Sequence, residues 1–127
     1  MKQMAVWIDH DQAHVLNVDG GASRTHADNR HIHRHPKDAD TRTRNHPQDE
    51  ARFFDDVTRL LVDAEEVLLL GPSVTKLHLL RYAQKHAPAV AARIVGIETA
   101  DHPTDRELLA HVRHYFHADP PRVGVSS

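Results

Sequence analysis

The spacing of apolar residues changes along the chain, and each spacing predicts a different element. Residues 4–18 hold two β-prone runs, 5–8 and 14–18, on either side of the polar residues 9–12, which predicts a β-hairpin. Residues 48–64 repeat apolar side chains every three or four positions, which predicts a helix with one core-facing stripe. The uninterrupted apolar run 67–70 is typical of a buried strand.

The second half alternates strands and helices. Gly71-Pro72-Ser73 turns the chain into a helix predicted over 74–86, and Ala87-Pro88 stops it. Residues 89–92 can add a short turn, and residues 93–99 predict the next strand. Thr104, followed three positions later by Glu107, predicts a capping box at the start of the last helix.

These elements predict an α/β fold with helices packed on a mixed sheet of about five strands that opens with an antiparallel hairpin. Right-handed crossovers make the strands at 67–70 and 93–99 parallel. A third strand falls at 22–27 or at 30–33. We expect a ribonuclease-H-like architecture with one domain over 1–117, a polar His/Arg-rich loop at 26–48 and a flexible tail at 118–127.

Composition narrows the classes of function. The chain has no cysteine, which excludes disulfides and thiolate metal sites, and it has no run of the ~20 apolar residues that a membrane helix needs. No signal-peptide core is present at the amino end, so we expect a cytoplasmic protein. Its net charge is −2 with 13 histidines, and histidine changes charge near pH 6.5.

Residues 26–48 lose apolar periodicity and gather histidine and arginine. Arginine binds phosphate oxygens through two parallel hydrogen bonds, and histidine stacks on unpaired bases. This pattern suits contact with the ribosome or another structured RNA, and a solvated loop without a ligand is the ordinary alternative. The candidate RNA-binding residues are Arg30, His31, His33, Arg34, His35, Lys37, Arg42 and Arg44.

Three alternate histidines within that segment allow a metal-binding interpretation. His31, His33 and His35 would share one face of a strand, where imidazoles bind Zn²⁺ or Ni²⁺. No fixed carboxylate or further pair at helical spacing accompanies them. We otherwise expect no cofactor.

Two further clusters have ordinary alternatives. Ser73 as the N-cap of a helix, with Lys76 in the first turn, predicts an anion-binding site, or simply a strand-to-helix turn. Carboxylates at strand ends would suit a metal-dependent nuclease, although Asp9 lies in a tight turn and Asp105 simply favours a helix N-terminus. The carboxylates in question are Asp9, Glu98, Asp101 and Asp105.

The chain resembles two groups of translation proteins. The Phe-Phe-x-x-Val stripe at 53–57, the apolar strand, the Gly-Pro-Ser turn and Lys76 resemble the middle domain of the archaeal and eukaryotic class-one release factor and of Pelota. The strings 6–10 and 95–105 resemble a bacterial family of translational machinery proteins. The motif residues that carry this second resemblance are Asp9, His10, Glu98, Asp101, His102 and Pro103.

These resemblances imply a role in translation without peptide release. The release factor uses a Gly-Gly-Gln tip, and here the only Gly-Gly, Gly20-Gly21, is followed by Ala22. We therefore expect a non-catalytic factor that contacts the ribosome or tRNA through 26–48, with stress or ribosome dormancy as the setting that the resemblance suggests. The alternatives are a histidine-loop metal-binding protein and, third, a ribonuclease-H-like nuclease. The sequence indicates no oligomeric state.

Overall fold

The computed structural model describes residues 2–18, 28–33 and 47–117. The strands are β1 Gln3–Ile8, β2 Gln12–Asn17, β3 Asp28–His33, β4 Glu66–Gly71 and β5 Ile94–Thr99. The helices are α2 Pro47–Leu60, α3 Thr75–His86, α4 Pro88–Ala91 and α5 Asp105–His117. No helix of this described part combines the length and apolar character needed to cross a membrane.

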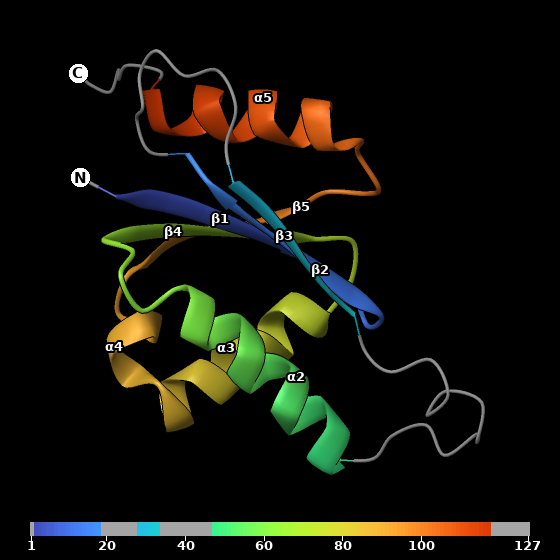
Figure 1. Ribbon diagram of the computed structural model, residues 1–127, viewed down its shortest axis with the longest axis vertical. Helices are drawn as coiled ribbons and strands as arrows, with labels where there is room; N and C mark the ends of the chain where they lie inside the picture. The colour runs from blue at the N-terminus through green and yellow to red at the C-terminus, as the bar shows by residue number, and fades with distance from the viewer. Residues whose placement is uncertain (1, 19–27, 34–46, 118–127) are drawn as a thin grey trace.

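The strands form one mixed sheet in the order β3-β2-β1-β4-β5. β1 pairs with β2 and β2 with β3 antiparallel, whereas β1, β4 and β5 run parallel. The predicted α/β fold, its opening hairpin and its parallel crossovers are confirmed. Helices α2, α3 and α4 lie on one side of the sheet and α5 on the other (Figure 1).

Strand alternation divides the interior into two cores. Met4, Val6 and Ile8 of β1 face the α2 side, and Ala5 and Trp7 face α5. β4 alternates in the same way, and a sheet covered on both faces explains its unbroken apolar run. The helices complete the cores with Phe53, Phe54, Val57 and Leu79 on one side and Leu108 and Val112 on the other.

Helix α2 ends earlier than its apolar stripe predicts. The helix closes at Leu60, and the chain continues in turns in which the Leu61 amide donates to Thr58 O and the Ala64 amide donates to Leu61 O. Leu61 and Ala64 are nevertheless only 2% and 1% exposed. The apolar spacing therefore correctly indicated which residues are buried, but not where the helix ends.

The segment predicted as a polar loop contains a strand. β3 occupies 28–33, overlapping the predicted alternative at 30–33, and it pairs with β2 from Gln12↔His33 to Asn17↔Asp28. An edge strand forms through its backbone ladder and does not need apolar alternation, so composition did not reveal its length. Residues 26, 27 and 34–46 lie outside the described part of the chain, as does the predicted tail at 118–127.

Candidate functional site at the carboxyl edge of the parallel strands

Asp9 follows β1 and organises the hairpin turn. Its Oδ1 accepts hydrogen bonds from the amides of Asp11 and Gln12 at 2.8 and 2.9 Å, and its own amide donates to Gln12 O at 3.0 Å. The residue is 8% exposed. Asp9 therefore acts first as a turn-forming side chain, the use of aspartate that its place between two strands favours.

The turn after β5 meets Asp9. His102 Nε2 lies 3.4 Å from Asp9 Oδ2, and His102 Nδ1 lies 3.1 Å from Asp101 Oδ1. The hydrogen bond to Asp101 is the main cause of the raised pKa of His102, and desolvation opposes it. The hydrogen bond to Asp9 and the negative charges of the Asp101 and Asp9 carboxylates raise this pKa further. The His102 side chain is 61% exposed, so it can exchange protons with solvent.

Trp7 lies beneath this contact and fixes it to the sheet. Its indole Nε1 donates to Ala100 O at 3.1 Å and to Asp101 O at 2.8 Å. The Trp7 ring packs edge-on against His102 and His14, with centroids 5.0 and 5.6 Å away. At 3% exposed, Trp7 is part of the core on the α5 side of the sheet.

Two other histidine–carboxylate pairs connect helix α5 to the sheet. His14 Nδ1 of β2 lies 3.3 Å from Asp105 Oδ1, and His111 Nε2 lies 2.6 Å from Glu98 Oε1 of β5. Neither pair was predicted from the sequence. Both contacts depend on how α5 crosses the sheet, for which the spacing of residues carries no signal.

Together these elements surround an open depression of about 530 Å³ at the carboxyl ends of β4 and β5. Ligands of open α/β sheets bind at this edge. The side chains that line it include Leu70, Glu98, His102, Pro103, Leu108 and His111. Four of the motif residues line this depression: Glu98, Asp101, His102 and Pro103. Asp9 does not line it but contacts His102. The His10 side chain is about three quarters exposed, and its Nε2 lies 3.6 Å from Asp11 Oδ2.

The nuclease interpretation required carboxylates that converge on Mg²⁺. Instead Asp9 serves the hairpin turn, Glu98 pairs with His111, and Asp105 pairs with His14. Within 2–18, 28–33 and 47–117, no group of three or more such ligands could hold a metal ion. The four carboxylates are therefore distributed among separate structural contacts and do not form the two-metal site that the hypothesis needs.

The turn after β4 differs in detail from its prediction. The N-cap of α3 is Val74 rather than Ser73, and no side chain caps the helix. Lys76 lies in the first turn, is 7% exposed, and donates from Nζ to Ser73 O at 2.7 Å. Ser73 and Lys76 are thus in contact, but through the backbone carbonyl of Ser73 and not through its side chain acting as a helix cap. Anion binding there stays a prediction.

The candidate RNA-binding residues are only partly described. Arg30, His31 and His33 belong to β3, where His31 is registered opposite His14 and His33 opposite Gln12. This places the start of the segment at one edge of the sheet. Arg34, His35, Lys37, Arg42 and Arg44 lie outside the described residues, as does the third histidine of the predicted metal site.

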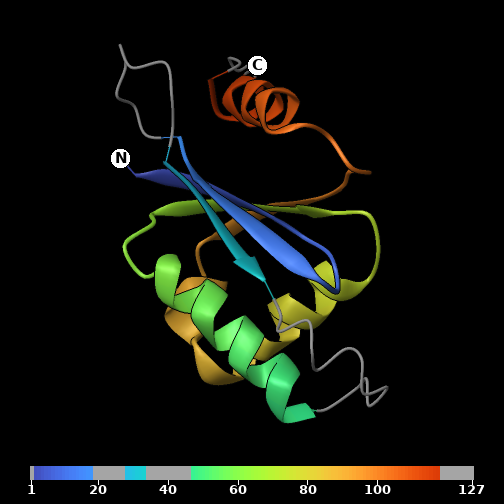
Figure 2. The same cartoon turned by 45° about the vertical axis from the view of Figure 1, so that its right-hand side comes forward.

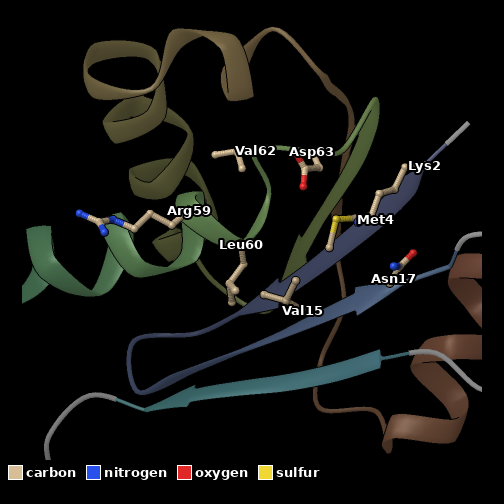
Figure 3. A pocket seen from close by; sticks show the side chains of 8 residues that line it. All are labelled: Lys2, Met4, Val15, Asn17, Arg59, Leu60, Val62 and Asp63. Carbon is tan, nitrogen blue, oxygen red and sulfur yellow. The ribbon is translucent and has the colours of Figure 1, made fainter.

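A smaller depression lies between α2 and the hairpin, on the other face of the sheet (Figure 3). Its volume is about 230 Å³. Met4, Val15 and Leu60 converge at its base, and Arg59 lies beside it, bound through Nε to Asp55 at 2.9 Å. None of the predicted site residues lines this depression, so the carboxyl edge remains the candidate site.

The fold matches parts of larger proteins of known structure. Archaeoglobus fulgidus Pelota matches with a TM-score of 0.59 and 13% identity over 92% of this chain and 36% of its own. Thermoplasma acidophilum Pelota matches with a TM-score of 0.60 and 15% identity over 94% and 32%. An archaeal translation termination factor matches with a TM-score of 0.56 and 12% identity over 92% and 37%.

No protein-family model matches the sequence, and no curated protein matches it, so the resemblance to the bacterial family stays a prediction. The chain spans about a third of the length of each solved structure named above. The predicted likeness to the Pelota and release-factor fold is confirmed by these matches. The chain has the α/β fold that forms part of Pelota and of the archaeal termination factor.

Proposed function

We propose that this protein acts in translation as a non-catalytic, cytoplasmic factor that contacts the ribosome or tRNA through residues 26–48. The observation that carries the proposal is the fold match over about nine tenths of the chain to Pelota and a termination factor. A yeast protein of the same fold, with a TM-score of 0.51, is described as a termination-like factor in RNA quality control. A shared fold supports a shared setting only by analogy, so the contact needs its own argument.

The chemistry of residues 26–48 supplies that argument. The segment holds five arginine or lysine residues, five histidines and three aspartates, which gives it a positive charge within a chain of net charge −2. β3 holds Arg30 and His31 in the sheet at its edge (Figure 1). Residues 28–33 of this cationic segment are already paired in the sheet, so the fold meets part of the ordering cost of binding a phosphate backbone.

A second phosphate contact is part of the proposal. The N-terminus of α3 carries no acidic residue in its first turn and no side-chain cap, and helix amides that are not capped attract anions. Lys76 stands in that turn beside Ser73. An RNA phosphate would have to compete with the Ser73 carbonyl for the Lys76 ammonium.

Co-sedimentation with 70S ribosomes and separated subunits across a salt series tests the proposal. We expect wild type to sediment near physiological salt and to dissociate as salt rises, since phosphate contacts release counterions. A variant with Arg30, Arg34, Arg42 and Arg44 changed to alanine should lose binding and show a shallower salt dependence.

A matched control removes the same charge elsewhere. Changing Arg52, Arg81, Lys85 and Arg106 to alanine alters four exposed cations on the helices, and this variant should bind like wild type. An equal loss of ribosome binding in both variants would mean that binding depends on the net charge of the protein and not on a specific contact through residues 26–48. Failure of wild type to sediment even at low salt would overturn the translation role.

The alternative function, metal binding by His31, His33 and His35, is separated by the same material. Isothermal titration with Zn²⁺ and Ni²⁺ should show binding that is lost on changing the three histidines to alanine and kept in the four-arginine variant. RNA contact predicts the reverse dependence on the arginines. The two proposals thus give opposite results with the same two variants.

A further inference from the structure

The two edges of the sheet have opposite characters. β3 has the sequence DNRHIH, and β5, at the other edge, has the sequence IVGIET. Natural edge strands carry charges, prolines or bulges that discourage pairing with another chain. β3 follows this rule through its charged residues. β5 has one such irregularity, in its register with β4 near Ile94–Gly96, but it has no charged residue from 94 to 97, and Glu98 is its one charged residue.

Apolar side chains are exposed along the β5 edge. Val95 and Ile97 are 48% and 40% exposed. Leu77 and Val74, on the neighbouring helix α3 and at its N-cap, are 43% and 56% exposed. Four of the five large hydrophobic residues that are exposed in the described part therefore belong to β5 and the start of α3, and the fifth is Val62.

A shallow groove joins these two elements. It has a volume of about 430 Å³ and is lined by Leu80 and Gln84 of α3, Ala91 of α4, and β5 from Ile94 to Ile97. Ile97 lies opposite Leu69, which belongs to the core on the α2 and α3 side, so Ile97 lies on the α3 side of the sheet, and Val95, two positions earlier, borders the same groove. Apolar side chains exposed beside a groove are a feature of interaction sites.

We propose that the β5 edge pairs antiparallel with the β5 edge of a second copy of this chain, about a two-fold axis at Gly96. In that register Val95 lies opposite the partner's Ile97, and Ile97 opposite the partner's Val95. Directly opposite residues in antiparallel strands share a face, so the apolar pairs form on the α3 side. The edge is thus complementary to itself, as a two-fold interface requires.

The charges at the two ends of β5 select the antiparallel direction. Arg93 precedes the strand and Asp101 follows it, and both are exposed, although one guanidinium nitrogen of Arg93 donates to Ala64 O at 3.0 Å. Antiparallel pairing places Arg93 diagonal to the partner's Asp101, within reach of a long side chain. A parallel arrangement would place Arg93 beside the partner's Arg93 and Asp101 beside the partner's Asp101, which like charges disfavour.

The pairing also closes the assembly. In one copy β3 and β5 are the two outer strands of the described sheet (Figure 2). The dimer uses the β5 edge of each copy, so the charged strand β3 of each copy stays at the outside. Those edges resist further pairing. The result is a dimer with one continuous sheet and not a growing fibre. It leaves the proposed contact through residues 26–48 free, because β3 lies at the opposite edge of the sheet. The proposed phosphate contact at the N-terminus of α3 lies beside Val74 and Leu77, so the two proposals adjoin there.

Sedimentation equilibrium from about 1 μM to about 1 mM tests the proposal. Wild type should change from the 14.4 kDa monomer towards twice that mass. Ile97→Lys should weaken association at least about tenfold, because it brings two lysines close to the axis and desolvates them. Val62→Lys, the same type of change at a residue 65% exposed away from β5, should associate like wild type.

Disulfide trapping tests the register separately. The chain has no cysteine, so a Val95→Cys, Ile97→Cys double variant carries only the two thiols that the proposed register places opposite their partners. Mild oxidation should give a covalent dimer, and a Val62→Cys variant should stay monomeric. Monomer at every concentration, or association equally strong in Ile97→Lys, would overturn the proposal, as would equal cross-linking of Val62→Cys.

Discussion

The contact between Gly96 and Tyr115 offers a quantitative test of how α5 sits on the sheet. A Cβ added at Gly96 would overlap the Tyr115 hydroxyl and would lie 3.1 Å from Tyr115 Cζ and 3.2 Å from Leu68 Cδ1. Gly96→Ala should therefore destabilise the fold through overpacking, which costs about 1–3 kcal/mol in close-packed interiors. We expect a cost of about 1 kcal/mol, because a tyrosine hydroxyl is the end of a side chain that can move.

Tyr115→Phe should remove most of that cost. The described residues give the Tyr115 hydroxyl no hydrogen-bond partner, so its deletion alone should change the free energy of unfolding by less than about 0.5 kcal/mol. In the double variant the overlapping atom is gone. Alanine also restricts the unfolded chain more than glycine does, by about 0.4–1 kcal/mol, so Gly96→Ala should be nearly neutral when it is combined with Tyr115→Phe.

Urea unfolding followed by the fluorescence of Trp7 is the assay, since Trp7 is the only tryptophan and is 3% exposed. Gly71→Ala is the matched control. A Cβ there would overlap the backbone carbonyl of Ile8, which cannot move alone, so its cost of about 3 kcal/mol should be the same with and without Tyr115→Phe. A cost of Gly96→Ala that Tyr115→Phe leaves unchanged would refute the assigned contact.

Three more predictions concern the carboxyl edge. Trp7→Phe should lower the free energy of unfolding by about 2–4 kcal/mol, measured by circular dichroism, because it opens a cavity and leaves the carbonyls of Ala100 and Asp101 without their indole donor; a loss below about 0.5 kcal/mol would contradict the geometry. Asp101→Asn should lower the pKa of His102, measured by NMR titration, since the hydrogen bond to Asp101 is the main cause of its raised pKa. The stability that the His102–Asp101 pair adds is present below the pKa of His102 in the unfolded chain and is lost as pH rises through its pKa in the folded protein. The wild type should therefore be more stable than Asp101→Asn at low pH, and this difference should shrink towards alkaline pH. Thr104→Ala should cost about 1 kcal/mol in urea unfolding, because Thr104 Oγ1 accepts from the Glu107 amide at 3.1 Å, and Thr104→Ser should retain most of that stability.

Local rules predicted the features that depend on nearby residues. The capping box at Thr104 and Glu107 forms both of its reciprocal hydrogen bonds, at 2.9 and 3.1 Å. The predicted N-cap of α3 was wrong: α3 begins one residue later, at Thr75, with Val74 as its N-cap. Lys76 Nζ donates to the Ser73 carbonyl, a contact that residue types alone do not specify.

Contacts between distant segments were outside the reach of sequence patterns. His102 meets Asp9 across 93 positions, and Trp7 meets Asp101 across 94. The β-prone run 5–8 placed Trp7 in a strand but could not show which carbonyls its indole reaches. The position of α5 over the sheet determines these contacts, and no spacing along the chain encodes it.

The two strings that suggested a family motif have a structural role. Asp9 accepts hydrogen bonds within the hairpin turn, and His102 lies between the carboxylates of Asp9 and Asp101. Trp7 donates to the carbonyl of Asp101, in the turn that carries Asp101 and His102. These contacts join β1 to the turn before α5, which is a structural use of the motif residues. A functional contact is therefore better sought where the fold leaves polar groups uncommitted. The sheet ends in a charged strand on one side and an apolar strand on the other, so RNA contact through residues 26–48 and self-association through β5 use different residues.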